Sequence, residues 1–310
     1  MRRGTSGINA LIAVDKPLGM TSHDVVARVR RALGERRVGH AGTLDPDASG
    51  VLVVGVGQGT RLMGLLTAER KSYVGLVVLG FETETDDAEG QVTREADVPS
   101  WAWDEAVVRD RLAKIEGPSM QVPPAYSAIS VNGVRSYARA RAGEHVELEA
   151  RPVTIHSASL AAIQDVEGRP GWLCAFDVSK GCYIRAIARD LGREFGSAAH
   201  LAGLRRTGSG SISLSSCVSL EDLERGGADL LATAALDPAA SLGAPVRMLT
   251  DDELADASCG KHLAAGDVDV EEGGRVCLVH GDKLYGVWER RADELVSSTN
   301  FPAGIMGVRR

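Results

Sequence analysis

The sequence predicts an α+β fold with a mixed, largely antiparallel sheet flanked by helices. Strand-like and helix-like segments follow one another without the regular strand–helix–strand rhythm of a doubly wound fold. Asn132-Gly133, directly after the apolar run 126–131, is typical of the two-residue turn that joins antiparallel strands. Beyond Pro245 short apolar runs alternate with Gly-rich turns, which predicts a small β-rich second domain.

The first part of the chain alternates a strand, a helix, a loop and a strand. Residues 8–14 are an apolar run that leads into Lys16-Pro17, as a buried strand ending in a turn would. Thr21 and Ser22 are N-cap candidates for a helix that Gly34 ends. Residues 35–50 lack periodicity and contain several Gly residues and a Pro, so we expect a long loop before the strand 51–56.

The remaining elements are predicted from the same patterns. Helical spacing covers 60–66, 104–115, 135–142 and 183–195, and strands are expected at 73–79, 153–161, 172–178, near 210–214, 268–280 and 283–289. The acidic segment Glu82–Asp87 is expected at the solvated end of a hairpin. We place the domain boundary between Leu236 and Met248, giving a catalytic domain 1–245 and a β-rich domain 246–310.

Composition indicates a soluble protein of a reducing compartment. Hydrophobic residues make up 44% and charged residues 25% of the chain, and no apolar run approaches the roughly 20 residues of a membrane helix. No export signal is evident, so the cytoplasm is expected. The five cysteines stand singly and are expected to be buried thiols, without metal-ligand spacing or a disulfide framework.

The net charge of −7 is unevenly distributed. Residues 1–62 and 178–210 carry an excess of Arg and Lys, whereas residues 211–260 carry an excess of Asp and Glu. Ordinary surface scatter accounts for many such patterns. A locally basic surface on an acidic protein is nevertheless compatible with a nucleic-acid partner.

Asp45 is the first candidate for a reactive side chain, because it lies in the aperiodic segment between two predicted elements. On its own, Asp45-Pro46 would be a common turn sequence. A glycoside-type hydrolase using Asp45 with Asp47 is disfavoured, because residues two apart hold their carboxylates closer than an inverting site needs. No Gly-x-Ser-x-Gly elbow is present, and Gly55–Gly59 fits neither a phosphate loop nor a dinucleotide-binding pattern.

Several segments, in order and at matching spacing, resemble the TruB family of tRNA pseudouridine-55 synthases. The resemblance covers roughly residues 8 to 215. Its segments are Lys16-Pro17-x-Gly19-x-Thr21-Ser22, Gly39-His40-Ala41-Gly42-Thr43-Leu44-Asp45-Pro46-x-Ala48-x-Gly50-Val51-Leu52, Lys71-Ser72-Tyr73 and Ser179-Lys180-Gly181-x-Tyr183-Ile184-Arg185.

The resemblance implies a pseudouridine synthase-like fold and an isomerase that needs no cofactor or metal. In this family the glycosidic bond of one uridine in the T loop of tRNA is broken, the uracil is rotated, and C5 is joined to C1′. The implied partner is the T-stem loop of tRNA, without a membrane or an obligate protein partner, and a monomer is expected. Unstacking the base costs a few kcal/mol, less in a loop than in a duplex.

The resemblance also implies roles for single residues. Asp45 would be the nucleophile, attacking either the base or the ribose, and Arg185 would be the cation that keeps its carboxylate charged and aimed. Tyr73 would pack against the target uracil. His40 and Tyr183 would lie at the substrate pocket, and Lys180 and Lys16 are further substrate-binding candidates. For Lys16 we favour ordering of the Asp45 loop over a phosphate contact.

The basic segments then gain a function beside the site. Two groups would contribute phosphate contacts, namely Arg30, Arg31, Arg36 and Arg37 before the Asp45 loop, and Lys180, Arg185, Arg189, Arg193, Arg205 and Arg206 in or after the last motif. The last domain resembles an RNA-binding PUA domain only loosely, since it is short and acidic near Asp251. A tRNA-binding folding helper is the alternative function; a guide-RNA-dependent relative would carry basic tails that this chain lacks.

Overall fold

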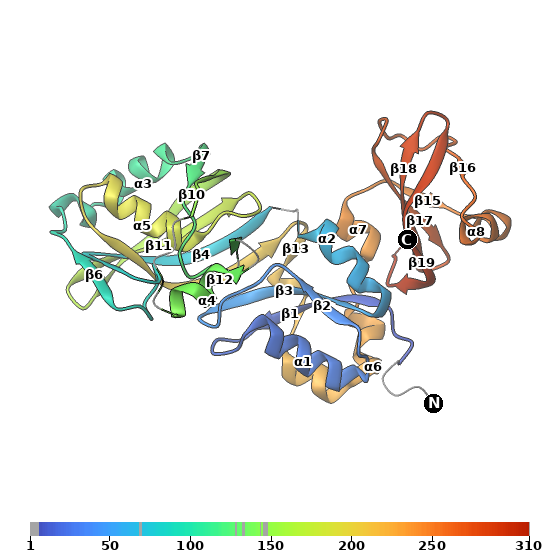
Figure 1. The fold of residues 1–310 in the computed structure, drawn as a ribbon, viewed down its shortest axis with the longest axis horizontal. Coiled ribbons are helices and arrows are strands. Elements are labelled where there is room, and N and C mark those ends of the chain that lie inside the picture. Colours follow the sequence, from blue (N-terminus) through green and yellow to red (C-terminus); the bar gives the residue numbers. More distant parts are fainter. Residues whose placement is uncertain are drawn as a thin grey trace. The chain divides into compact units, whose positions relative to one another are not determined.

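A computed structural model describes residues 6–67, 70–127, 129–131, 134–142, 144 and 148–309 (Figure 1). The chain forms two compact units. The first unit combines residues 1–69 with 208–310, and the second consists of residues 70–207. Each unit contains strands and helices in irregular order, which confirms the predicted α+β class.

The first unit contains a small mixed sheet with the strand order β14-β1-β3. β1 (Ala10–Lys16) pairs antiparallel with β3 (Ala48–Val56) and parallel with β14 (Cys217–Val218). A further strand, β2 (Val38–Ala41), pairs antiparallel with β3. The prediction of a continuous loop over residues 35–50 is therefore wrong for its first half. Gly39 and the polar His40 hide the strand pattern of β2.

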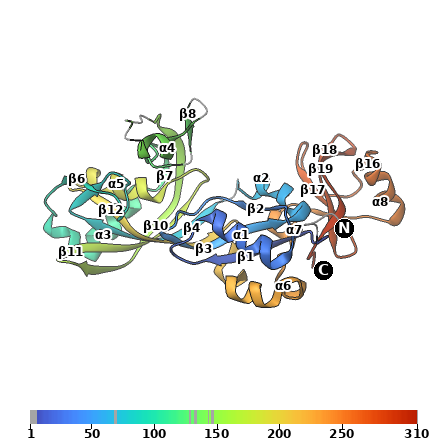
Figure 2. The same cartoon turned by 60° about the horizontal axis from the view of Figure 1, so that its bottom comes forward.

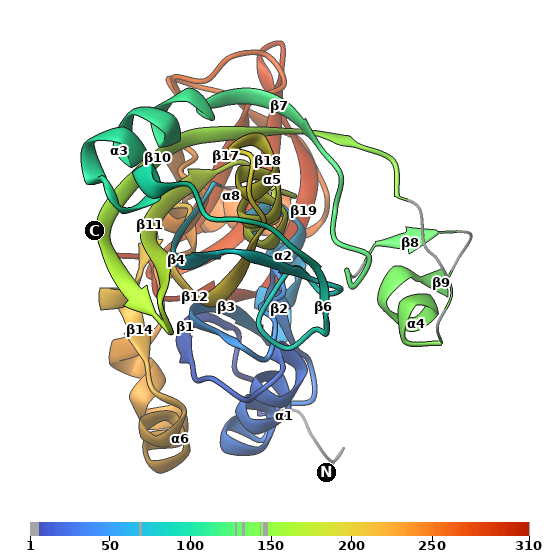
Figure 3. The same cartoon turned by 90° about the vertical axis from the view of Figure 1, so that its left-hand side faces the viewer.

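Two helices pack against this sheet (Figure 3). α1 (Ser22–Leu33) begins at Thr21, whose hydroxyl accepts a hydrogen bond from the Asp24 N–H, and ends at Gly34 with φ 60°. α6 (Leu220–Ala234) lies beside α1, and its Leu223 shares a core cluster with Val25 of α1 and Ile12 of β1. The sequence predicts α1 correctly but misses α6, which contains the Gly226-Gly227 pair.

The C-terminal residues of the first unit form a second sheet with the order β15-β17-β18-β19-β16. Its strands are β15 (Val246–Met248), β16 (Leu263–Ala264), β17 (Arg275–His280), β18 (Lys283–Arg291) and β19 (Glu294–Met306). Cys277 and Phe301 of this sheet share a core cluster with Leu11 of β1. The division of the chain at residue 245 stays a prediction, because the first unit includes both sheets.

The second unit is built on a sheet with the order β12-β4-β11-β10-β7. Its strands are β4 (Lys71–Leu79), β7 (Gly117–Gln121), β10 (Arg151–Val166), β11 (Arg169–Val178) and β12 (Ala199–Ser209, which ends in the first unit). Helix α5 (Ile184–Glu194) packs on this sheet through a core cluster that includes Ile187, Leu191 and Trp172. Helix α3 (Glu105–Lys114) contributes Val108 and Leu112 to the same cluster.

A small module projects from the second unit (Figure 2). It consists of β8 (Ser130–Val131), β9 (Val134–Arg135) and α4 (Ser136–Arg141), and β8 pairs antiparallel with β9. This pairing agrees with the predicted hairpin, whereas its turn residues Asn132 and Gly133 lie outside the described residues.

The other elements are β5 (Phe81–Thr83), β6 (Val92–Glu95), β13 (Ile212–Ser213), α2 (Met63–Leu66), α7 (Pro238–Leu242), α8 (Asp251–Ser258), and the 3-10 helices η1 (Gly57–Leu62), η2 (Ser100–Trp103) and η3 (Leu214–Ser216).

The cysteines differ in environment. Cys174 and Cys277 are buried as predicted, whereas Cys259 is exposed, which corrects the expectation for that residue. Cys182 and Cys217 are partly buried, and none of the five cysteines forms a disulfide. In the described part of the chain, no helix has the length and apolar character needed to cross a membrane.

Candidate active site

The side chain of Lys16 fixes the backbone of the loop that carries Asp45. The Lys16 side chain is fully buried at the end of β1. Its Nζ donates hydrogen bonds to the carbonyl oxygens of Pro17 at 2.9 Å, Met20 at 2.5 Å and Pro46 at 3.3 Å. A buried ammonium is stable only when its hydrogen-bonding capacity is satisfied, so Lys16 ties the Pro17–Met20 turn to the residue after Asp45.

Further hydrogen bonds fix the same loop. The Ser22 hydroxyl at the start of α1 donates to the Leu44 carbonyl at 3.0 Å and accepts from the Leu44 N–H at 2.9 Å. The Gly19 N–H donates to the Pro46 carbonyl at 2.9 Å. These bonds hold the residues on both sides of Asp45 by their backbones, and Asp45 itself is partly buried. The loop therefore presents one carboxylate from a rigid support, as a catalytic side chain requires.

His40 lies on β2, upstream of the Asp45 loop, and is partly buried. Its ring meets the ring of His23 edge-on, with centroids 5.5 Å apart and an interplanar angle of 85°. Gly42 follows with φ 85°, a conformation that a residue with a side chain rarely adopts. The Gly therefore allows the chain to turn from β2 into the Asp45 loop.

In the second unit, Arg185 stands in the first turn of α5 and is 7% exposed. Its Nη1 donates to the Thr85 carbonyl at 3.0 Å and to the Asp87 carboxylate at 3.2 Å, and its Nη2 donates to the Tyr126 carbonyl at 3.0 Å. Three acceptors from two segments thus set the plane of this guanidinium. Asp45 belongs to the first unit and Arg185 to the second, so their pairing stays a prediction.

The other predicted residues of the second unit surround the start of α5. Tyr183 is its N-cap residue, and its backbone N–H donates to Gln121 Oε1 at 2.9 Å while its carbonyl accepts from Gln121 Nε2 at 3.2 Å. Tyr73 lies on β4, is partly buried and packs against the core cluster that includes Phe176. Lys180 is exposed in the turn between β11 and α5.

Three arginines one turn apart on α5 bind the acidic segment 82–87. Arg185 pairs with Asp87, Arg189 Nη1 with Asp86 at 2.8 Å, and Arg193 Nη2 with Glu82 at 2.6 Å. β5 and β6 form a hairpin here and Glu84 is exposed, but Glu82 and Asp86 are 3% and 7% exposed, so the predicted solvation is wrong for these two residues. The expected phosphate contact of Arg189 is also wrong, because its guanidinium is buried and also donates to the Val122 carbonyl.

The two buried carboxylates of this segment respond differently to burial. Burial raises the pKa of Asp86 to about 6, although Arg189, Arg185 and Arg193 act in the opposite direction. Burial also raises the pKa of Glu82, but hydrogen bonds from Arg193 and Arg94 outweigh it and leave that pKa below its usual value. Of these two carboxylates, Asp86 therefore changes charge closer to neutral pH.

A pH dependence of stability follows from Asp86. Because its pKa is higher in the folded protein than in the unfolded chain, the folded state binds the extra proton, and the contribution to stability is lost as pH rises from about 4 to about 6. Relative to Asp86→Asn, the wild type is expected to lose up to about 3 kcal/mol of unfolding free energy across this range. Asn suits the left-handed backbone there, since Asp86 has φ 61°.

Urea unfolding of both proteins at several pH values measures this difference. The Asp86→Asn protein loses the carboxylate that pairs with Arg189, which lowers its unfolding free energy by the same amount at every pH. This constant loss does not change how the difference in unfolding free energy between the two proteins varies with pH. A difference that is flat or rises with pH would contradict the assignment to Asp86.

Asp86, Asp87 and Gln121 are site-supporting residues that the sequence analysis did not single out. The signal was present in the spacing of Arg185, Arg189 and Arg193, which places all three on one helix face, and in the acidic segment 82–87. The arginines were instead interpreted as phosphate contacts, with Arg185 also as the partner of Asp45, and the acidic segment was interpreted as a solvated hairpin end. Among the described residues, no group of three His, Cys, Asp or Glu side chains could hold a metal ion.

Comparison with known families gives two matches along the chain. The model of the TruB family pseudouridylate synthase N-terminal domain matches residues 30–184, and that of the tRNA pseudouridylate synthase B C-terminal domain matches residues 185–237. Curated proteins named tRNA pseudouridine synthase B are similar over most of their length. That of Paenarthrobacter aurescens is 47% identical over 263 residues, covering 84% of this chain and 82% of the relative. That of Leifsonia xyli is 41% identical over 297 residues, covering 95% and 97%.

Solved structures show the same fold. A Cbf5-Nop10-Gar1 complex contains a chain that matches with a TM-score of 0.70 and 24% identity, covering 96% of this chain and 85% of that one. An archaeal box H/ACA Nop10-Cbf5 complex matches with a TM-score of 0.67 and 24% identity, covering 94% and 85%. At this identity the likeness concerns the fold alone.

Proposed function

The chain belongs to the TruB family of pseudouridylate synthases, and from this premise we propose that it isomerises one uridine in the T loop of tRNA to pseudouridine. The family assignment makes the chain an isomerase that acts on RNA. The choice of tRNA is supported by the curated relatives, whose name specifies that substrate. The T loop as the target is supported by the matching motif segments around Lys16, Asp45, Tyr73 and Arg185.

The reaction rearranges the nucleotide without net addition or loss of atoms. The N1–C1′ bond of the uridine breaks and a C5–C1′ bond forms, while the C5 proton leaves to solvent and N1 gains a proton. In our proposal the Asp45 carboxylate is the nucleophile that attacks the uridine and is released once the new bond has formed. The uridine must first leave the base stack to reach it.

The observation that carries this proposal is the construction of the Asp45 loop. A buried Lys16 and the Ser22 hydroxyl hold the backbone on both sides of Asp45 by hydrogen bonds to carbonyl groups. An aspartate in an ordinary solvent-exposed turn does not need a buried cation to fix the backbone around it. The cost of burying the ammonium is offset by its hydrogen bonds to the three carbonyl oxygens, and these same bonds fix the position of the Asp45 loop.

Arg185 and Tyr73 complete the proposed chemistry. In this proposal the guanidinium of Arg185, whose plane is fixed by Thr85, Asp87 and Tyr126, keeps the nucleophile charged and aimed. The partly buried ring of Tyr73 stacks on the uracil and lets it rotate. His40, Tyr183 and Lys180 line the substrate side, and Lys16 acts through the loop. The enzyme acts as a monomer in the cytoplasm, without an obligate protein partner.

Release of tritium tests this reaction. A tRNA transcript labelled with tritium at C5 of uridine is incubated with purified protein, and tritium in the water is counted. We expect release equivalent to one uridine per tRNA, and none from a transcript whose T-loop target uridine is replaced by cytidine. No release from the first transcript, or equal release from both, would refute the proposal.

The tRNA affinity is expected to depend on salt through the basic group before the Asp45 loop. Arg36 and Arg37 are exposed between α1 and β2. If Arg36 neutralises one phosphate, Arg36→Ala should reduce the slope of log affinity against log salt by about 0.7 to 0.9. Lys114→Gln is the matched control, because that ammonium is paired with Asp110 and lies outside both basic groups, and its slope should equal that of the wild type. An affinity that is flat across salt concentrations would contradict the role of this group.

A further inference from the structure

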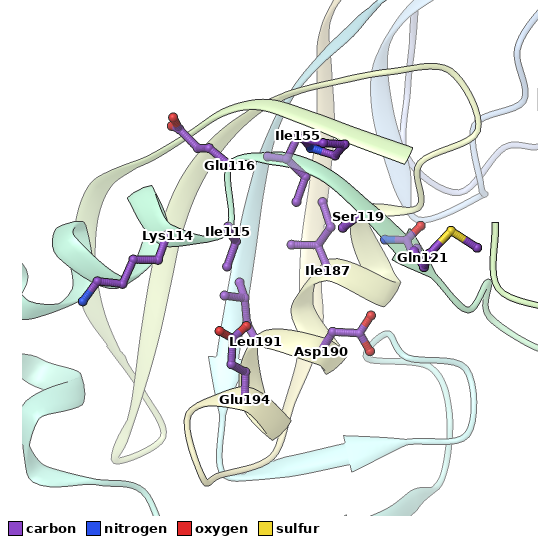
Figure 4. A pocket seen from close by; sticks show the side chains of 12 residues that line it. Lys114, Ile115, Glu116, Ser119, Gln121, Ile155, Ile187, Asp190, Leu191 and Glu194 are labelled. Carbon is purple, nitrogen blue, oxygen red and sulfur yellow. The ribbon is translucent and has the colours of Figure 1, made fainter. Parts of the chain in front are cut away.

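A cavity of about 420 Å³ lies in the second unit between the strand β7, the end of α3 and the helix α5 (Figure 4). Its lining combines aliphatic with charged side chains. The aliphatic residues are Ile115, Met120, Ile155, Ile187 and Leu191, and the charged ones are Lys114, Glu116, Asp190 and Glu194. None of these residues belongs to the active site proposed above.

The charges around this cavity are mostly negative. Glu116, Asp190 and Glu194 contribute carboxylates, but Asp190 is paired with Arg189 at 2.8 Å, so the unbalanced negative charge comes from Glu116 and Glu194. The ammonium of Lys114 is 2.6 Å from the Asp110 carboxylate and so is also paired. Glu194 is exposed on α5. A phosphate backbone would be repelled by such a rim, so the cavity does not suit RNA. A cationic group on an aliphatic stem suits it, because the stem can cover isoleucine while the charge meets a carboxylate.

The cavity adjoins the edge of the sheet. β7 is the last strand in the order β12-β4-β11-β10-β7, and among the described residues it pairs with β10 alone. The Thr154 N–H donates to Ser179 Oγ, and the Thr154 carbonyl accepts from the Ser179 N–H, so the backbone of Thr154 faces away from β7. Backbone direction alternates along a strand, and therefore Val153 and Ile155 face β7.

The register then shows which groups of β7 point outward. Ser119 lies opposite Val153 and bonds toward β10, whereas Met120 lies opposite Pro152, which has no N–H to offer. The N–H and C=O of Met120 consequently face the open side of the edge. An open strand edge is a template for pairing with another extended segment.

Two apolar side chains are exposed here, Met120 on β7 and Val122 directly after the end of that strand. Met120 is 64% exposed and Val122 is 46% exposed. Residues two apart in an extended segment lie on the same face, so both can contact one partner. Methionine adapts well to binding surfaces because its side chain is flexible and polarisable.

We propose that the edge of β7 binds an extended, cationic segment of a partner protein, which adds a strand beside β7 and inserts a Lys or Arg side chain into the cavity toward Glu194. The strand would be held by Met120 backbone hydrogen bonds, and the inserted side chain would be selected by the acidic rim. A second copy of this chain would bring the same carboxylates to the edge and is disfavoured by like-charge repulsion.

A designed peptide tests the surface in the full-length protein. The probe is the acetylated and amidated peptide Lys-Val-Lys-Val-Lys-Val-Lys-Val, titrated into protein with labelled Met and Ile methyl groups. We expect saturable binding with Kd below about 1 mM, with the largest methyl shifts at Met120, Ile155 and Ile187. The same peptide with Glu in place of Lys should not bind.

Variants test separately the contribution of the Glu194 charge and that of the β7 strand edge to peptide binding. Glu194→Lys should weaken binding by about tenfold. Glu95→Lys, a charge reversal at an exposed position on β6 outside the cavity, is the matched control and should bind as the wild type does. Met120→Pro removes the outward N–H and should abolish binding. Wild-type affinity in Glu194→Lys, binding of the Glu peptide, shifts elsewhere in the protein, or no saturation would each overturn the proposal.

Discussion

Replacing Asp45 with Asn is expected to lower the rate of pseudouridine formation by at least about 10⁴-fold, because an amide cannot serve as the nucleophile. Asn has nearly the same size, and Lys16 and Ser22 hold the backbone on both sides of position 45 by bonds that the substitution leaves in place. The fold and the affinity for tRNA should therefore remain. Single-turnover tritium release with saturating protein measures the chemical step, and filter binding measures the affinity.

Asp47→Asn provides the matched control for this prediction. Asp47 is exposed two residues further along the same loop, and none of the hydrogen bonds that fix the loop depends on its side chain. We expect the Asp47→Asn protein to retain activity within about threefold of the wild type, which amounts to less than about 1 kcal/mol. Equal losses in the two variants would mean that charge in the loop matters rather than a nucleophile at Asp45.

Replacing Lys16 with Met is expected to lower the unfolding free energy by about 3 to 5 kcal/mol and to abolish activity. The methionine fills similar space but leaves the carbonyl oxygens of Pro17, Met20 and Pro46 without their shared donor. The loop loses its support even if the protein still folds. Urea unfolding followed by circular dichroism measures the stability.

Lys261→Met is a control for the loss of a positive charge. Lys261 is exposed, with its ammonium 2.6 Å from Asp256, and removal of a surface pair of this kind should change stability by less than about 1 kcal/mol. A similarly small effect of Lys16→Met would contradict the supporting role of the buried ammonium. Retained activity in Lys16→Met would contradict its role in ordering the Asp45 loop.

Local sequence signals predicted much of the fold. The helix from Ser22 to Leu33 follows from a Thr N-cap, apolar residues on one face and a terminal Gly34, all of which act within a few residues. Strands β3 and β11 follow from continuous or alternating apolar residues. The motif identified the Asp45 loop. For Lys16 the sequence allowed two roles, ordering of this loop or a phosphate contact, of which the first was favoured.

Features set by distant parts of the chain were not predictable in this way. β12 lacks regular alternation and contains Arg205-Arg206, yet Arg206 is only 1% exposed within the fold. In the acidic segment 82–87, Glu82 and Asp86 are buried beside arginines about one hundred residues later in the chain, which neutralise them. In both cases a charged sequence predicts solvent exposure, and only the tertiary partners reverse it.

The position of the product in tRNA tests the central claim most directly. Unmodified tRNA is incubated with the wild type and with Asp45→Asn, and pseudouridine is mapped at single-nucleotide resolution by a chemical adduct that stops reverse transcription. The account predicts one stop, at a single uridine of the T loop, with the wild type and none with Asp45→Asn. No stop with the wild type, a stop outside the T loop, or the same stop with Asp45→Asn would contradict it.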